Sequence, residues 1–191
     1  MRIIAGYARG ITLRAPAAGV RPTADRVKES LFSALEPIVG FTVVDLFAGS
    51  GALGLEALSR GADAVYWVER DRRTVRQIEA NLAKVQAAIK EKDAPARVLT
   101  GDATLAHRLL PGIQPDLILA DPPYNPERGQ KGGADLLLDP DFAAWAGTAL
   151  LVLEQSSRVE LPAAALAHWR VDRQRRYGDT TLHFLYANKG Q

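Results

Sequence analysis

The hydrophobic pattern of the chain alternates between short continuous apolar runs and longer stretches in which apolar residues recur every three or four positions. Continuous runs are typical of strands buried on both faces, and the wider spacing is typical of helices. The predicted strands are Thr42–Leu46, Ala64–Val68, Arg97–Thr100, Asp116–Ala120 and Ala149–Glu154. The predicted helices are Ala52–Arg60, Arg72–Lys90, Ala103–Leu110 and Ala134–Trp145. This alternation predicts a parallel sheet covered by helices.

The last predicted elements depart from this alternation. Two long segments, Trp169–Tyr177 and Thr180–Ala187, flank the tight turn Gly178-Asp179. Such a pair predicts a hairpin that adds antiparallel strands to one edge of the sheet. A mostly parallel, Rossmann-like sheet that ends in an antiparallel hairpin resembles the class I S-adenosylmethionine-dependent methyltransferase fold. We therefore expect an α/β protein of that fold class rather than a plain dinucleotide-binding domain.

The beginning of the chain carries a different pattern. Two short extended segments, Arg2–Gly6 and Gly10–Arg14, predict a small hairpin. Apolar residues at helical spacing then predict a helix from Asp25 to about Glu36. We expect an amino-terminal extension of hairpin plus helix over residues 1–38 and a methyltransferase domain over residues 39–191.

Positive charge is concentrated in this extension. The chain has a formal net charge of only +2, but residues 1–28 hold six basic side chains against Asp25 alone. Basic side chains neutralise phosphates and release counterions, although for charge taken alone a solvated surface is the simpler interpretation. Because this is the only strongly basic segment we identify, Arg21, Arg26 and Lys28 are the candidates for contacts with the phosphates of a nucleic acid.

Composition excludes several other classes of protein. A chain of 191 residues, 47% of them hydrophobic, is long enough for one main compact domain. It contains no cysteine and only three scattered histidines, so we expect neither a disulfide nor a metal site. No apolar run approaches the roughly 20 residues of a membrane helix, and the opening residues do not form a signal peptide. We expect a cytoplasmic monomer with no membrane partner.

The first predicted strand runs into a glycine-rich turn. Gly49, Gly51 and Gly54 match the spacing G-x-G-x-x-G, in which glycines allow a sharp turn and close approach of a ligand. Nicotinamide-dependent enzymes share this spacing, and such a turn can also be purely structural. Asp45 lies just before the glycines, where a carboxylate suits a ligand with an amino-acid ammonium better than one with a pyrophosphate.

Two further acids follow predicted strands in the same way. Glu69 comes after the second strand, where a carboxylate can accept hydrogen bonds from both hydroxyls of a ribose. Asp102 comes after the third strand and is a candidate acceptor for an adenine amino group. Either acid alone could equally be a helix cap or a solvated side chain. Together with Asp45 they form an ordered set that predicts a site for S-adenosylmethionine.

The most specific motif is the tetrapeptide Asp121-Pro122-Pro123-Tyr124, which follows the fourth strand. An exocyclic base amine is a poor nucleophile, so a catalyst should accept hydrogen bonds from its hydrogens and hold it pyramidal. The Asp121 carboxylate and the Pro122 carbonyl are suitable acceptors. The two prolines fix the backbone direction, and the Tyr124 ring can stack on a base turned out of its helix. The motif predicts methyl transfer to an amino nitrogen of a nucleic-acid base.

Several segments together resemble one known family. Arg21–Phe32, Asp45–Gly54 and Asp121–Tyr124 resemble the RsmD family of 16S ribosomal RNA guanine N2-methyltransferases, and the likeness extends through nearly the whole chain. The Arg-Pro-Thr run that begins at Arg21 is far more family-specific than the glycine turn. Small departures lie in a long connection at residues 86–96 and in the glycine-rich residues 125–133.

The resemblance implies a partner, a cofactor and a set of functional residues. The partner is 16S rRNA within the small ribosomal subunit or an intermediate of its assembly, and the cofactor is S-adenosylmethionine. Cofactor contacts are implied at Asp45, Gly49, Gly51, Glu69 and Asp102. Asp121 to Tyr124 would meet the target amine, and Arg21 and Arg26 would face RNA.

Three alternatives stay open from the sequence. Enzymes with the same tetrapeptide also methylate adenine N6 or cytosine N4 in nucleic acid, or a protein glutamine. The glycine spacing alone would also fit a nicotinamide-dependent oxidoreductase. A non-catalytic RNA-binding module on the same fold is the third alternative.

Overall fold

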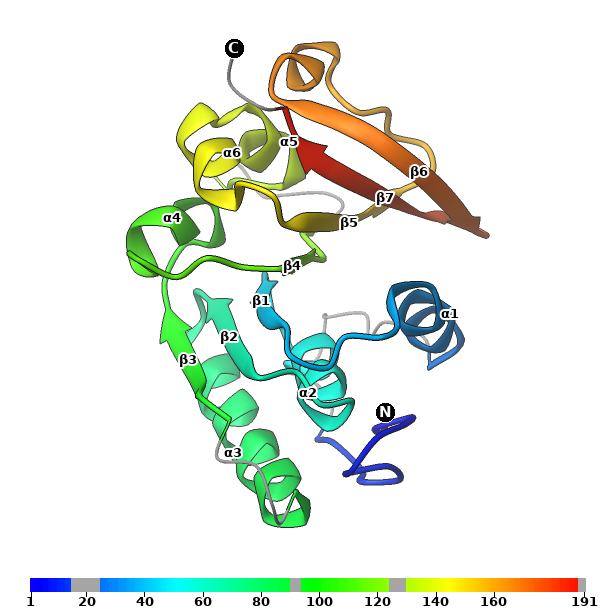
Figure 1. Cartoon of the computed structure of the whole chain (residues 1–191), viewed down its shortest axis with the longest axis vertical. Coiled ribbons are helices and arrows are strands. Elements are labelled where there is room, and N and C mark those ends of the chain that lie inside the picture. Colours follow the sequence, from blue (N-terminus) through cyan, green and yellow to red (C-terminus); the bar gives the residue numbers. More distant parts are fainter. Residues whose placement is uncertain (15–24, 90–93, 124–129, 189–191) are drawn as a thin grey trace.

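A computed structural model describes residues 1–14, 25–89, 94–123 and 130–188 of the protein. One seven-stranded sheet runs through the molecule (Figure 1). Its strands are β1 (Thr42–Leu46), β2 (Ala64–Glu69), β3 (Ala96–Thr100), β4 (Leu117–Ala120), β5 (Leu150–Ser156), β6 (Trp169–Tyr177) and β7 (Thr180–Ala187). The α-helices are α1 (Asp25–Leu35), α2 (Ala52–Ser59), α3 (Arg72–Ala88), α4 (Ala106–Leu109), α5 (Gly133–Leu138) and α6 (Pro140–Ala146). Short 3-10 turns are η1 (Ala103–Leu105) and η2 (Ala163–Ala167).

The strands lie in the order β3-β2-β1-β4-β5-β7-β6. The first five pair in parallel, and β7 is antiparallel to both of its neighbours, β5 and β6. The chain order reverses between β1 and β4, which is the position where ligands bind in open parallel sheets. The predicted parallel sheet with an antiparallel terminal hairpin is confirmed, and both hairpin strands have the predicted bounds.

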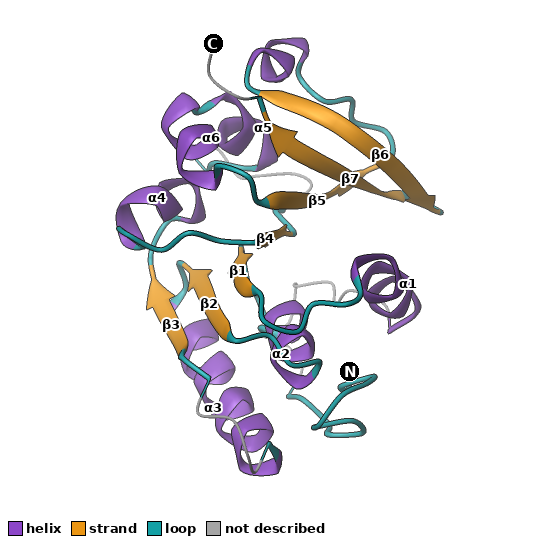
Figure 2. Ribbon diagram, viewed as in Figure 1, coloured by secondary structure: helices purple, strands orange, loops and turns teal. Residues whose placement is uncertain are grey.

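Helices cover both faces of the sheet and enclose two apolar cores (Figure 2). One core lies under α1, α2 and α3, and the other lies under α4, α5 and α6. Ile3, Leu13 and Phe32 from the amino-terminal extension belong to the first core, together with Val43 and Trp67 of the sheet. The described residues of the extension, 1–14 and 25–38, therefore contribute to the same core as the sheet.

Three predicted elements differ in detail from the structure. The helix predicted over Ala103–Leu110 is the 3-10 turn η1 followed by the short helix α4. The amino-terminal segment forms a loop closed by one antiparallel bridge, Arg2 to Thr12, in place of a regular hairpin. The single helix predicted over Ala134–Trp145 is two helices, α5 and α6. They separate at Asp139, whose Oδ1 accepts hydrogen bonds from the backbone N–H groups of Asp141 at 2.9 Å and Phe142 at 3.3 Å. A side chain in this position caps a new helix, so α5 cannot continue through it.

Candidate active site

The predicted functional residues of the sheet meet at one edge. Leu46, the last residue of β1, pairs with Val68 of β2 and with Ala120 of β4. Glu69, the last residue of β2, pairs with Thr100 of β3. The segments that follow these four strands therefore emerge side by side at the carboxyl edge of the sheet. They carry the glycine turn, Glu69, Asp102 and the beginning of the Asp121 motif.

The glycine turn has the backbone geometry that its sequence predicts. Gly49 and Gly51 adopt positive φ angles of 53° and 75°, where a side chain would be strained. Gly54 lies in the first turn of α2, and a Cβ added there would stand 2.3 Å from Nε1 of the Trp67 side chain. The third glycine thus allows α2 to pack directly on β2, and the first two allow the chain to turn sharply at the sheet edge.

Asp45 is buried beneath this turn. Its side chain is only 2% exposed, and Oδ2 accepts a hydrogen bond from the Gly54 backbone N–H at 2.8 Å. Burial raises the pKa of Asp45 well above its ordinary value, and although the Gly54 hydrogen bond lowers it, the charges of Asp121 and Glu69 add to the rise. The same carboxylate thus satisfies a donor at the start of α2 and belongs to a group of three acids. Such a group favours a cationic ligand.

Glu69 and Asp102 are half-buried and hydrogen-bonded locally. Glu69 accepts from the Gly49 N–H at 3.0 Å and from the Asp71 N–H at 2.9 Å, one bond on each carboxylate oxygen. Asp102 Oδ1 accepts from the N–H and the hydroxyl of Thr104, at 3.0 and 2.9 Å, and neither bond uses Oδ2. A carboxylate can accept about four hydrogen bonds, so each acid keeps capacity for a ligand.

The Asp121 motif follows β4 directly. The Asp121 N–H lies 3.4 Å from the carbonyl oxygen of Leu46, and its half-buried side chain is close enough to influence the pKa of Asp45. Pro122 is buried, whereas Pro123 is exposed. A Cβ added at Gly133, the first residue of α5, would stand 3.2 Å from Pro122 Cγ, so the helix packs closely on the proline ring. Tyr124 lies outside the described residues.

The three basic candidates have different positions. Arg26 is exposed in the first turn of α1, and Arg21 lies outside the described residues. Lys28 is fully buried, with its ammonium 3.2 Å from Glu56 Oε2 and donating to the carbonyl oxygen of Arg2. The prediction that Lys28 contacts RNA phosphates is therefore wrong, because its charge is enclosed inside the protein.

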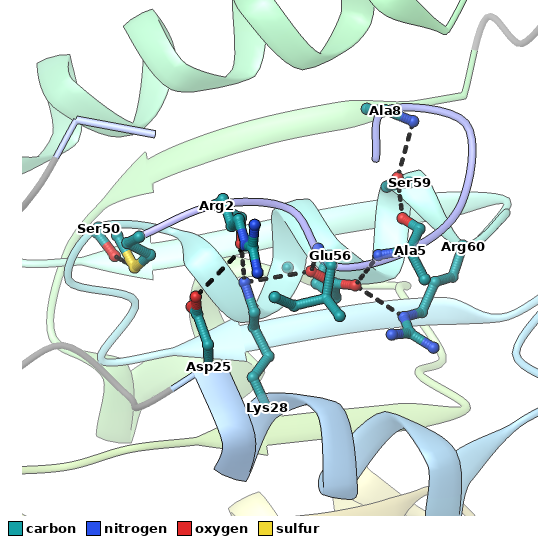
Figure 3. A network of polar contacts seen from close by, with 12 residues as sticks. Arg2, Ala5, Ala8, Asp25, Lys28, Ser50, Glu56, Ser59 and Arg60 are labelled. Atoms are coloured by element: carbon teal, nitrogen blue, oxygen red, sulfur yellow. Dashed lines mark hydrogen bonds and ion pairs between the residues drawn. The ribbon is translucent and has the colours of Figure 1, made fainter. Parts of the chain in front are cut away.

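Glu56 of α2 is the centre of a buried polar network that the sequence analysis did not identify (Figure 3). Its two carboxylate oxygens accept from the N–H groups of Ile4 and Ala5, at 2.8 and 2.9 Å, and from Arg60 Nε at 2.9 Å, in addition to facing Lys28. The network joins the amino-terminal segment, α1 and α2. A charged residue in an otherwise apolar helix is the only signal for it in the sequence.

Asn81 of α3 is a second buried polar residue that ties the extension to the site. Its side chain bonds to both the N–H and the carbonyl oxygen of Arg14, at 2.9 and 3.3 Å, and to the carbonyl oxygen of Ser50 at 3.3 Å. Ser50 lies between Gly49 and Gly51. Asn81 therefore fixes residue 14 of the extension beside the glycine turn.

In the described ranges, no group of three or more histidine, aspartate or glutamate side chains is arranged to hold a metal ion. Among the helices that the structure describes, none combines the length and the apolar character that crossing a bilayer requires.

The strand order and the carboxyl-edge motifs define a class I methyltransferase. A solved structure described as "Putative methyltransferase yhhF from Escherichia coli" has the same fold, with a TM-score of 0.72 and 33% sequence identity. The superposition covers 100% of this chain and 99% of that one.

Sequence comparison gives the family. Residues 1–186 match the family described as "Conserved hypothetical protein 95". "Ribosomal RNA small subunit methyltransferase D" of Escherichia coli strain K12 is 37% identical over 193 residues, which cover 100% of this chain and 91% of the relative. "Putative rRNA methyltransferase YlbH" of Bacillus subtilis strain 168 is 34% identical over the full length of both chains. The chain belongs to this family, and its resemblance to the RsmD family is confirmed.

Proposed function

We propose that this chain transfers a methyl group from S-adenosylmethionine to the exocyclic N2 amine of a guanine in 16S rRNA. The substrate is the small ribosomal subunit or an intermediate of its assembly. The observation that carries the proposal is that Asp121 and Pro122 lie beside the glycine turn at the same edge of the sheet. The chain that shows this arrangement also belongs to the family described above. The name of the Escherichia coli relative supports the ribosomal substrate.

The cofactor would lie along the carboxyl edge of β1, β2 and β3. Glu69 would accept from the ribose hydroxyls, and Asp102 would accept from the adenine amino group. Gly49 and Gly51 would let the backbone approach the cofactor closely. The three acids Asp45, Glu69 and Asp121 suit a cofactor that carries both a sulfonium and an ammonium charge. S-adenosylmethionine supplies an activated methyl group, so the site needs no metal or covalent intermediate.

Asp121 and Pro122 would act on the target amine. The Asp121 carboxylate and the Pro122 carbonyl would accept hydrogen bonds from its two N–H groups and hold the nitrogen pyramidal, which would free its lone pair from the ring. That pair would form the bond to the methyl carbon while the electrons of the carbon–sulfur bond would return to sulfur. One proton would leave the nitrogen for solvent, and the products would be N2-methylguanine in the RNA and S-adenosylhomocysteine. Most of the acceleration would come from positioning the two reactants.

Three residues would meet the RNA itself. Arg26, exposed on α1, and Arg21 would contact phosphates, and the Tyr124 ring would stack on the target base. The roles of Arg21 and Tyr124 rest on the sequence motif.

Methyl transfer from labelled S-adenosylmethionine tests the proposal. Unmodified small subunits, protein-free 16S rRNA and DNA are offered separately, and the labelled nucleosides are identified after digestion. We expect N2-methylguanosine from one site in the ribosomal substrate. Label in N6-methyladenosine, in N4-methylcytidine or in protein would assign the chain to a related amino-methyltransferase. Calorimetric binding of NAD but not of S-adenosylmethionine would identify an oxidoreductase.

A further inference from the structure

Strand β6 is a second strongly basic segment, in addition to the one at residues 1–28. Its nine residues include four arginines and one acid, Asp172. β6 is the last strand of the sheet, so one of its two edges has no neighbouring strand. All four arginine side chains, Arg170, Arg173, Arg175 and Arg176, are exposed.

A β-bulge brings three of these arginines to one face. Strict alternation would put Arg170 on the face opposite to Arg173 and Arg175. The register with β7 shifts at Asp172, so Arg170, Arg173 and Arg175 lie opposite Tyr186, Phe184 and Leu182. These three partners alternate along β7 and share one face of the sheet, and directly opposed side chains point to the same side. We call Arg170, Arg173 and Arg175 the arginine stripe.

Two arginines of the stripe, Arg170 and Arg173, are held in place by aromatic rings and not by acids. The Arg170 guanidinium lies 5.5 Å from the centre of the Tyr186 ring, and the Arg173 guanidinium lies 4.5 Å from that of Phe184. Arg173 also donates to the carbonyl oxygen of Ala34 in α1 at 3.1 Å. Among the ion pairs of the described residues, none involves an arginine of the stripe. Stacked arginines keep their charge for a ligand and lose less conformational freedom when they bind it.

The hairpin leads from the stripe to the carboxyl edge of the sheet. Ser156, the last residue of β5, pairs with Thr180 at the hairpin turn, and the Ser157 N–H donates to Asp179 at 2.8 Å. β6 lies three strands from β4, whose end carries the Asp121 motif. At about 4.8 Å between neighbouring strands, that separation is roughly 14 Å. A nucleic-acid strand of a few nucleotides spans this distance.

We propose that the arginine stripe binds the phosphates of the target RNA and leads its strand toward the carboxyl edge. The inference rests on the proposed function, since it takes RNA as the partner. Phosphates are the ligands that a row of arginines without acidic partners would attract on an exposed strand. Charges on an edge strand also discourage unwanted strand pairing, and that simpler role predicts aggregation of a neutralised protein without loss of RNA affinity.

The test compares two variants with the same change of charge. Arg170→Gln/Arg173→Gln/Arg175→Gln neutralises the stripe. Arg76→Gln/Arg97→Gln/Arg108→Gln removes three exposed arginines from α3, β3 and α4, away from the hairpin. Because Arg173 also contacts α1, a third variant, Arg170→Gln/Arg175→Gln, leaves that contact intact. Affinity for unmodified small subunits is measured over a range of salt concentrations, with cofactor affinity and melting temperature measured in parallel.

The stripe variant should bind subunits on the order of 100-fold more weakly at 0.1 M salt, and its logarithmic salt slope should fall by about 2. The variant Arg170→Gln/Arg175→Gln should show about two thirds of that fall in the salt slope, because it removes two of the three charges. The control should keep the wild-type slope, and all variants should keep cofactor affinity. Wild-type affinity and slope in the stripe variant, or an equal loss in the control, overturns the inference. A wild type that binds subunits without forming N2-methylguanosine overturns only the proposed function, and one that binds neither subunits nor 16S rRNA overturns both.

Discussion

The Lys28 ammonium lies 3.2 Å from Glu56 Oε2, and both side chains are completely buried. This ion pair joins α1, whose first turn exposes Arg26, to α2, which begins at the glycine turn. A buried pair is expensive to break, because the remaining partner is left charged in a medium of low dielectric constant. The pair therefore holds the extension and the glycine turn in one fixed arrangement.

Replacement of Lys28 should reduce stability rather than RNA affinity. Lys28→Met leaves Glu56 with Arg60 as its remaining cation, so we expect a loss of about 3 kcal/mol, near the lower end for broken buried pairs. In a chain of this size that corresponds to a fall in melting temperature of roughly 6–12 °C. Thermal unfolding measures it. Arg26→Gln on the same helix is the control and should change stability by less than about 0.5 kcal/mol. Equal melting temperatures for Lys28→Met and wild type would show that the pair does not stabilise the fold.

Asp45 should destabilise the folded protein at neutral pH. A carboxyl group whose pKa is raised on folding disfavours the folded state as pH rises above its unfolded pKa of about 3.9. Asp45→Asn removes that charge, and its amide oxygen can still accept from Gly54. The variant should therefore melt at a higher temperature than wild type at pH 7, and the difference should vanish below about pH 4.

The same variant should bind S-adenosylmethionine more weakly, because the acidic group loses one charge. Thermal unfolding from pH 3 to pH 8, combined with calorimetry, tests both effects. A stability difference that does not depend on pH would contradict the assignment of a raised pKa to Asp45.

Glu69 should contribute to cofactor affinity directly. Glu69→Ala removes the proposed acceptor for the ribose and also frees the Gly49 N–H that the carboxylate now holds. Loss of a charge-assisted hydrogen bond should weaken S-adenosylmethionine binding about 10- to 150-fold. Calorimetry gives the dissociation constant for S-adenosylmethionine. The control is Glu79→Ala, on the exposed side of α3, which removes the same charge as Glu69→Ala. An unchanged constant for Glu69→Ala would remove this residue from the site.

Gly54 should not tolerate even one methyl group. In Gly54→Ala the new carbon would lie 2.3 Å from Trp67 Nε1 and 2.6 Å from its Cε2. The indole is fully buried and cannot withdraw, so we expect a loss of about 1–3 kcal/mol or more. In the control Gly101→Ala, the new carbon meets the end of the flexible Leu109 side chain, which can move aside. Chemical denaturation compares the two, and equal losses would contradict the proposed close packing of α2 on β2.

The strands were predictable because each is a local pattern. Continuous apolar runs predicted β1, β2 and β4 with nearly their observed bounds. The two-residue turn Gly178-Asp179 predicted the hairpin of β6 and β7. The break between α5 and α6 also had a local signal in Asp139-Pro140. It was missed because the apolar residues on both sides continue at helical spacing.

The position of Lys28 could not be predicted in this way. It lies one turn before Leu31 and Phe32 on the buried side of α1, but lysine is almost never fully buried without a partner. That partner, Glu56, comes from another helix, and only the tertiary fold brings the two together. The arginine stripe was hidden for a related reason, because a bulge at Asp172 overrides the alternation that a sequence pattern assumes.

Asp121→Asn tests whether the carboxyl edge of β4 holds the target amine during methyl transfer. The variant keeps one carbonyl acceptor but loses the negative charge, which we propose acts mainly in the transition state. The measurement is the single-turnover rate of N2-methylguanosine formation on unmodified small subunits, with the dissociation constant for S-adenosylmethionine determined alongside. We predict a rate about 100-fold lower or more, with cofactor affinity within a few-fold of wild type. A wild-type rate in Asp121→Asn, or a loss accounted for by weaker cofactor binding alone, would contradict the assignment.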